Sequence, residues 1–121
     1  MREGKVAIIR RSATLREPAM LSILSAVELE GGVSVAAEGA RERRVKLDAI
    51  YDAMEIRSFE WPDVLAYRKI VTRLGFSRPK IIDRMIAAQA ITSGARLATL
   101  NPRDFRGIAE LQIDDWSIAQ S

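Results

Sequence analysis

One stretch of this chain decides most of the fold prediction: residues 81–105, which read IIDRMIAAQAITSGARLATLNPRDF. Ile81 to Ser93 predicts a helix that closes at Gly94, because glycine readily adopts the backbone conformation that ends helices. Arg96 to Leu100 then predicts a strand that enters the turn Asn101-Pro102. A helix followed by a strand and a turn is typical of layered α/β proteins.

The residues upstream alternate in the same way. Met20 to Ser25 is a short apolar run suited to a buried strand, and Ser25 followed by Glu28 has the spacing of a capping box at the start of a helix. Gly31-Gly32 is expected to end that helix. Between Gly39 and Met54, apolar residues recur at helical spacing opposite a charged face, which predicts an amphipathic helix.

The remaining segments complete the pattern. An extended segment near Ile56 to Phe59 precedes Trp61-Pro62, where proline suits the first turn of a helix that ends at Gly75. Asp104 to Ala109 predicts one short helical turn, and Leu111 to Trp116 alternates as an edge or terminal strand would. Both tryptophans are expected to pack rather than to stack on bases. We therefore expect an α/β fold with a mainly parallel sheet and no internal repeat or linker.

The composition indicates one soluble domain, residues 1–121. Of the 121 residues, 48% are apolar and 29% are charged, which is enough for one core and too small for two. The longest apolar runs are too short to cross a bilayer, and we expect a cytoplasmic protein. The chain has no cysteine and no histidine, which excludes disulfides, thiolate or imidazole metal ligands and Ser-His-Asp catalysis. Any enzymatic chemistry must use carboxylates, hydroxyls, amines or a bound metal.

Three carboxylates, Glu28, Asp83 and Asp104, lie where extended segments give way to helix starts or turns. Taken singly, each has a structural explanation as part of a helix cap or as an acid near a helix N-terminus. Taken together they could hold Mg²⁺ or Mn²⁺, because such ions prefer oxygen ligands and keep several waters. Glu30 is not expected to be a ligand, since on a helix it points about 200° away from Glu28.

The sequence around these acids resembles PIN-domain ribonucleases of the VapC toxin type. The resemblance rests on Glu28-Leu29, Asp83 to Ala88 and Thr99 to Phe105, in matching order and spacing, and extends over about residues 18–116. It implies a three-layer α/β/α fold and an endoribonuclease that hydrolyses RNA with a metal-activated water. It also implies that Glu28, Asp83 and Asp104 are catalytic acids that hold the metal, with Thr99 and Asn101 as supporting polar residues.

The same resemblance implies an antitoxin protein as partner, and a homodimer. Arg78 and Lys80 could bind RNA phosphates, in keeping with a net charge of +3. The alternative is that these two cations neutralise nearby acids or lie on a solvated helix face. Three further arginines near the acids are weaker candidates for RNA contact: Arg84, Arg103 and Arg106.

The start of the chain departs from the family. Similar members begin with a central strand that ends in an aspartate, the first metal ligand, whereas this chain opens with MREGKVAIIRR and has no matching acid there. An absent central strand would leave two rows of backbone groups unpaired. We expect Met1 to Leu15 to form a helix, with Val6 to Ile9 as a replacement strand as the alternative. Compensation could otherwise come from a second copy of the chain or from residues upstream of Met1.

The sequence is therefore consistent with two functions of different classes. The first is a magnesium-dependent ribonuclease of the VapC type. The second is a truncated, catalytically impaired PIN-domain remnant that binds an antitoxin or associates with itself. A third, a response-regulator-like or other α/β binding domain, would use the acids as helix caps alone.

Overall fold

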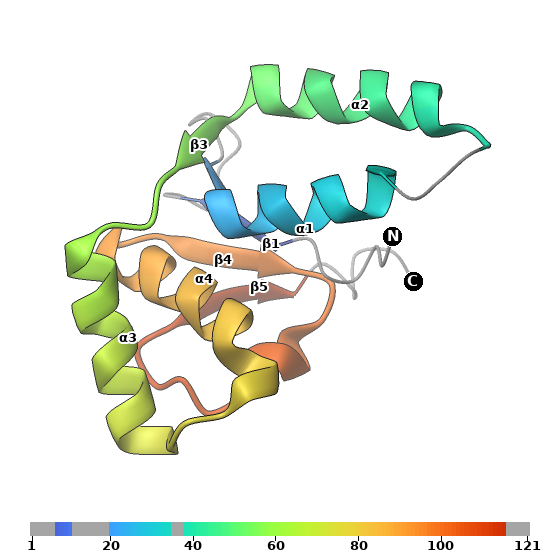
Figure 1. The fold of residues 1–121 in the computed structure, drawn as a ribbon. Helices are drawn as coiled ribbons and strands as arrows, with labels where there is room; N and C mark the ends of the chain where they lie inside the picture. The colour runs from blue at the N-terminus through green and yellow to red at the C-terminus, as the bar shows by residue number, and fades with distance from the viewer. Residues whose placement is uncertain (1–6, 11–19, 35–37, 116–121) are drawn as a thin grey trace.

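The computed structural model describes residues 7–10, 20–34 and 38–115. These residues form five strands, four α-helices and two short 3-10 helices (Figure 1). In chain order they are β1 (Ala7–Arg10), β2 (Met20–Ser22), α1 (Ile23–Ser34), α2 (Ala40–Ala53), β3 (Glu55–Arg57), α3 (Trp61–Leu74), η2 (Arg78–Lys80), α4 (Ile81–Thr92), β4 (Arg96–Thr99), η3 (Pro102–Phe105) and β5 (Gln112–Asp115). None of the helices in these ranges has both the length and the apolar character needed to span a membrane.

The five strands form one mixed sheet in the order β3-β2-β1-β4-β5. β2 and β3 are parallel, as are β4 and β5, while β1 runs antiparallel to both of its neighbours. Four strands therefore point one way, and the central strand points the other way. This agrees with the expected α/β fold and mainly parallel sheet, with β1 as the exception.

The helix expected over Met1 to Leu15 is wrong for residues 7–10, which form β1. Ile8 pairs with Leu21 on one side and with Ala98 on the other, so β1 satisfies the backbone of both β2 and β4. Ile9 is fully buried, and β-branched side chains of this kind suit a central strand. The alternative, a replacement strand, is the one the structure adopts. The other residues of the predicted helix lie outside the described ranges.

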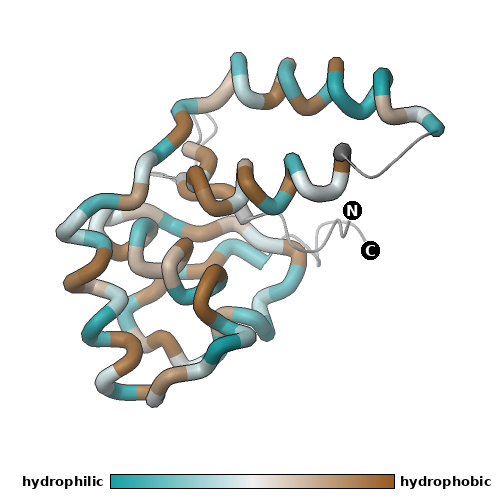
Figure 2. The backbone as a smooth tube through the Cα atoms, in the orientation of Figure 1, coloured by the Kyte–Doolittle hydropathy of each residue, from teal (hydrophilic) through white to brown (hydrophobic). Residues whose placement is uncertain are grey.

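Helices cover both faces of the sheet, which gives three layers. Successive side chains of a strand point to opposite faces, and β2 illustrates this with two buried neighbours. Met20 packs in the larger core cluster with residues of α3 and α4, whereas Leu21 packs with residues of α1 and α2. Figure 2 shows apolar residues recurring along α1 and α4.

The first helix begins and ends differently from the prediction. α1 begins at Ile23, and its cap is Ser22, whose hydroxyl accepts a hydrogen bond of 3.0 Å from the backbone N–H of Leu24. The predicted capping box from Ser25 to Glu28 is therefore wrong. Gly31-Gly32 does not end the helix, because Leu29 and Val33 both pack in the cluster around Leu21 and carry α1 past the glycines. Glycine within a helix costs only about 1 kcal/mol, which this packing offsets.

The other predicted elements are present with boundaries shifted by a few residues. The short helical turn expected from Asp104 begins earlier, as η3 at Pro102, and Gly75 ends α3 with a left-handed φ of 84°. The prediction that Trp61 packs is wrong, since this side chain is 63% exposed at the start of α3. Trp116 lies outside the described residues.

Candidate active site

Asp83 lies in the first turn of α4. It is the third residue of the helix and is 8% exposed. The N-terminal end of a helix carries a partial positive charge, which stabilises a carboxylate placed there. The preceding turn, η2, leads directly into α4, so Asp83 follows the end of η2 by three residues. Asp83 is thus a largely buried acid at the N-terminal end of a helix that packs against β1 and β4.

Asp104 is held by the turn that follows β4. Thr99, the last residue of β4, is 1% exposed, and its hydroxyl accepts a hydrogen bond of 3.0 Å from the backbone N–H of Asn101. Pro102 then opens η3, and Phe105 anchors it in the core at 3% exposure. Asp104 lies between them, half-buried. Because α4 packs against η3, Asp83 and Asp104 come from adjacent elements near the carboxyl end of β4.

Glu28 is less closely tied to this region. It lies in the second turn of α1, and it is exposed, although α1 itself packs against α4. Within residues 7–10, 20–34 and 38–115, no three acidic side chains come together in a group that could hold a metal ion. The roles of Glu28, Asp83 and Asp104 in metal binding therefore stay a prediction.

The donor chemistry of the site suits a hard cation. Carboxylate and hydroxyl oxygens are what Mg²⁺ prefers, and this ion is commonly bound by one or two carboxylates together with waters and substrate phosphates. Asp83 and Asp104 could supply such a pair. β1 adds no acid at this level, since the residue paired with Thr99 is Ala7. The types of oxygen donor present therefore fit a hard divalent cation.

Cations lie on both sides of the two acids. Arg78 is exposed and Lys80 half-buried in η2, immediately before α4. Arg84 has a different role, because it is 8% exposed and donates a hydrogen bond of 2.7 Å from Nη1 to the carbonyl of Gly75. This bond ties the end of α3 to the start of α4. Two further arginines, both exposed, flank Asp104: Arg103 and Arg106.

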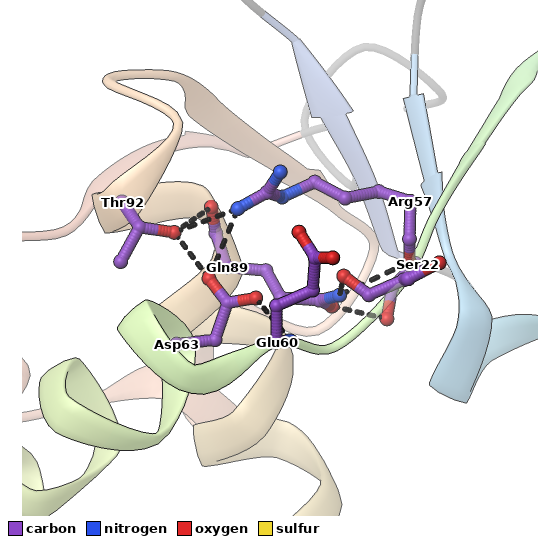
Figure 3. A network of polar contacts seen from close by, with 7 residues as sticks. Ser22, Arg57, Glu60, Asp63, Gln89 and Thr92 are labelled. Carbon is purple, nitrogen blue, oxygen red and sulfur yellow. Dashed lines mark hydrogen bonds and ion pairs between the residues drawn. The ribbon is translucent and has the colours of Figure 1, made fainter.

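A second, buried acid was not identified from the sequence. Asp63 in α3 is fully buried, and its Oδ1 accepts hydrogen bonds from Arg57 Nη2 at 3.0 Å and from the hydroxyl of Thr92 (Figure 3). Its Oδ2 accepts the backbone N–H of Glu60 at 2.9 Å. Glu60 and Asp63 form a reciprocal capping box at the start of α3, and the spacing of these acids before a helix start is a signal that could have found it.

Gln89 extends this network from α4 to β2, to β3 and to the residue that follows β3. It is fully buried in α4, and its Nε2 donates to the carbonyls of Arg57 at 3.1 Å and Ser58 at 3.0 Å. Its Oε1 accepts a hydrogen bond from the hydroxyl of Ser22 (Figure 3). The network thus joins β2, β3, α3 and α4 through hydrogen bonds between polar side chains and backbone groups. We interpret it as structural, because buried polar groups of this kind are normally hydrogen-bonded to one another.

Glu30 is fully engaged in holding α1 to α2. Arg44 donates to both of its carboxylate oxygens at 2.7 Å, and the hydroxyl of Tyr51 donates to Oε2 at 2.7 Å. The hydrogen bond from Arg44, and then that from Tyr51, lower the pKa of Glu30 from 4.5 to about 2. Burial and the hydrogen bond to Glu30 raise the pKa of Tyr51 to about 12. This arrangement gives Glu30 a structural role between α1 and α2.

The model of the PIN domain family matches residues 2–111. No curated protein matches the sequence. The chain is similar to DNA-bound VapBC from Salmonella typhimurium, with 22% identity and a TM-score of 0.68 over 80% of this chain and 74% of that one. It is similar to VapBC2 from Rickettsia felis bound to a DNA fragment from its promoter, with 28% identity and a TM-score of 0.67 over 78% of this chain and 72% of that one. It is also similar to VapBC-1 from nontypeable Haemophilus influenzae, with 20% identity and a TM-score of 0.71 over 88% of this chain and 80% of that one.

Proposed function

Because the chain belongs to the PIN-domain family, we propose that it is a metal-dependent endoribonuclease of the VapC toxin type. PIN domains are generally nucleases, and the fold is the one found in VapBC toxin–antitoxin complexes. The observation that carries the proposal is the placement of Asp83 and Asp104 on two packed elements near the carboxyl end of β4. The substrate would be an RNA phosphodiester, and we treat residues 1–121 as one unit of this fold.

All three carboxylates would contribute to binding the metal ion. Asp83 and Asp104 would bind Mg²⁺ or Mn²⁺, and Glu28 would contribute from α1. When bound, the ion supplies a water of lowered pKa and stabilises charge on the phosphate. The bond from Asn101 to the Thr99 hydroxyl would keep the turn that carries Asp104 in place.

The cations around the acids would bring RNA to them. Arg78 and Lys80 in η2 lie five and three residues before Asp83 and would bind phosphates that flank the scissile bond. Binding of this kind releases counterions and weakens as salt is raised. Their contribution would therefore show in the affinity for RNA rather than in the rate of the chemical step.

A partner protein is also part of the proposal. The similar structures are VapBC complexes, which supports an antitoxin as the natural partner of this chain. We further propose a cytoplasmic homodimer that the antitoxin holds inactive. Copurification of the chain with the product of a neighbouring reading frame would test the partnership.

Cleavage of labelled RNA by the purified protein tests the activity. We expect cleavage with Mg²⁺ and none with a chelator, and a loss of about 100-fold or more in Asp104→Asn. Asp83→Asn should behave in the same way, with thermal unfolding used to check that each variant folds. Asp52→Asn is a matched control, because Asp52 is an exposed acid on α2, away from β4. Equal cleavage by wild type and both site variants would overturn the assignment.

One observation favours the second function, a catalytically impaired binding module. The strand next to the site, β1, places Ala7 opposite Thr99, and an alanine has no carboxylate to add to the site. A site with fewer acids carries less negative charge and binds cations more weakly. Under this alternative the protein binds its antitoxin and shows no magnesium-dependent cleavage of any RNA. A metal affinity equal to that of an intact four-acid PIN domain would contradict it.

A further inference from the structure

A pocket lies along one side of α3, away from the candidate active site. It has a volume of about 210 Å³ and is bounded by α3, by the C-terminal end of α4 and by the loop after η3. Its apolar lining includes Leu65, Ile70 and Ile108. Thr92, at this end of α4, is nine residues from Asp83, which corresponds to about 13 Å along the helix axis. The pocket is therefore a separate feature from the carboxylates.

Two cations stand at the edge of this pocket. Lys69 and Arg73 both line it, and they lie four residues apart on α3, so their side chains are neighbours on the helix surface. Glu110 on the loop side is the one acid in the lining. Within the described residues, no ion pair joins either cation to an acid. The edge thus offers two cations to an anionic partner.

Large apolar side chains are also exposed near both ends of α3. Trp61 is 63% exposed next to Pro62, which lines the pocket, and Phe76 is 64% exposed two residues after Leu74, which also lines it. Large aromatic side chains left exposed in this way are typical of protein interaction surfaces. The pocket is smaller than the roughly 300 to 1,000 Å³ of typical small-molecule sites. Its size favours one or two inserted side chains over a whole cofactor.

We propose that this face of α3 is a docking site for an acidic amphipathic helix of a partner polypeptide. Apolar side chains of the helix would fill the pocket, and flanking carboxylates would meet Lys69 and Arg73. Helices bind grooves in this manner through anchors spaced along one face. Cations outnumber acids in the lining, two to one, which favours an acidic partner on this face. The proposal does not depend on nuclease activity.

Binding of synthetic peptides to the full chain tests the proposal. The probe is a labelled helical peptide with leucines on one face and glutamates beside them, followed by fluorescence anisotropy. We expect the double variant Lys69→Glu/Arg73→Glu to bind at least about tenfold more weakly, because two attractions become repulsions. Arg68→Glu is the matched control, since Arg68 is an exposed cation on α3 that does not line the pocket, and it should change binding less than twofold.

Further peptides and variants separate the possible outcomes. A peptide with lysines in place of the glutamates, and one with serines in place of the leucines, should both bind weakly. Ala66→Leu fills the pocket and should weaken the original peptide in protein that still unfolds at the wild-type temperature. Equal binding by the serine peptide, or by the double variant, would overturn the proposal. Sedimentation that shows a dimer broken by Lys69→Glu/Arg73→Glu would assign the face to a second copy and would also overturn it.

Discussion

Ala7, the first residue of β1, lies opposite Thr99, the last residue of β4. The pairing places an antiparallel strand at the centre of a sheet whose other four strands are parallel to one another. Within the described residues, β1 thus pairs with both β2 and β4 and lies between them. The strand brings alanine, rather than an acid, to the level of Thr99. β1 therefore fills the centre of the described sheet and adds no acid at the level of Thr99.

Asp63→Asn should lower the free energy of unfolding by about 3 kcal/mol, because it removes the charge that Arg57 pairs with in the interior. Urea denaturation measures this loss. Asp52→Asn, at an exposed acid on α2, should change the same free energy by less than about 0.5 kcal/mol. Equal losses in the two variants would show that the buried pair does not stabilise the fold.

Gln89→Leu should destabilise the protein by about 2 to 4 kcal/mol. The carbonyls of Arg57 and Ser58 would lose a donor, and the buried Ser22 hydroxyl would lose its acceptor. Thermal unfolding measures the change. A smaller loss is expected for Ser22→Ala, about 1 kcal/mol, since it removes a helix cap and one bond to Gln89. A Gln89→Leu protein as stable as wild type would contradict the structural role of the network.

Glu30→Gln should reveal a pH-dependent contribution to stability. The pKa of Glu30 is about 2 in the folded protein, against an ordinary 4.5, so the unfolded chain binds more protons between these values. The stabilisation is therefore fully present above about pH 4.5 and is lost as pH falls towards 2. The gap between wild type and Glu30→Gln in urea midpoint should shrink over this window. In an Arg44→Gln background the effect of Glu30→Gln should be smaller, because the contact is already absent.

A gap that stays constant from neutral pH down to about pH 3 would contradict the low pKa of Glu30. Direct titration of the Glu30 carboxylate by NMR gives an independent value. The experiment also tests the link between α1 and α2, since Arg44 and Tyr51 both belong to α2.

Local patterns predicted α2, α3 and α4 well, and they predicted the start of α1 and the central strand poorly. The proline at position 62 and the glycine at position 75 sufficed to bound α3, because helix starts and ends are specified by a few neighbouring residues. β1 depends instead on partners far along the chain: Ile8 pairs with Leu21 and Ala98. Nothing in the short run around Ile8 and Ile9 reveals that two strands with unpaired backbones lie on either side.

The candidate site shows the same division between local and distant information. Sequence motifs pointed to Asp83 and Asp104, and the structure places both on elements that pack together. Motifs do not give the distance between side chains, and the described residues hold no three-acid group. Asp63 was missed because its partners, Arg57 and Thr92, come from a strand and from the end of another helix.

The most direct test of the central claim is the location of a bound ion. Mn²⁺ broadens the NMR signals of nearby nuclei and prefers the same oxygen ligands as Mg²⁺. Titrated into the labelled protein, it should broaden the amide signals around Asp83 and from Thr99 to Asp104 first, and Asp83→Asn should weaken this effect. Broadening centred on the acids of α2, such as Asp48 and Asp52, or unchanged broadening in Asp83→Asn, would contradict a metal site at the carboxyl end of β4.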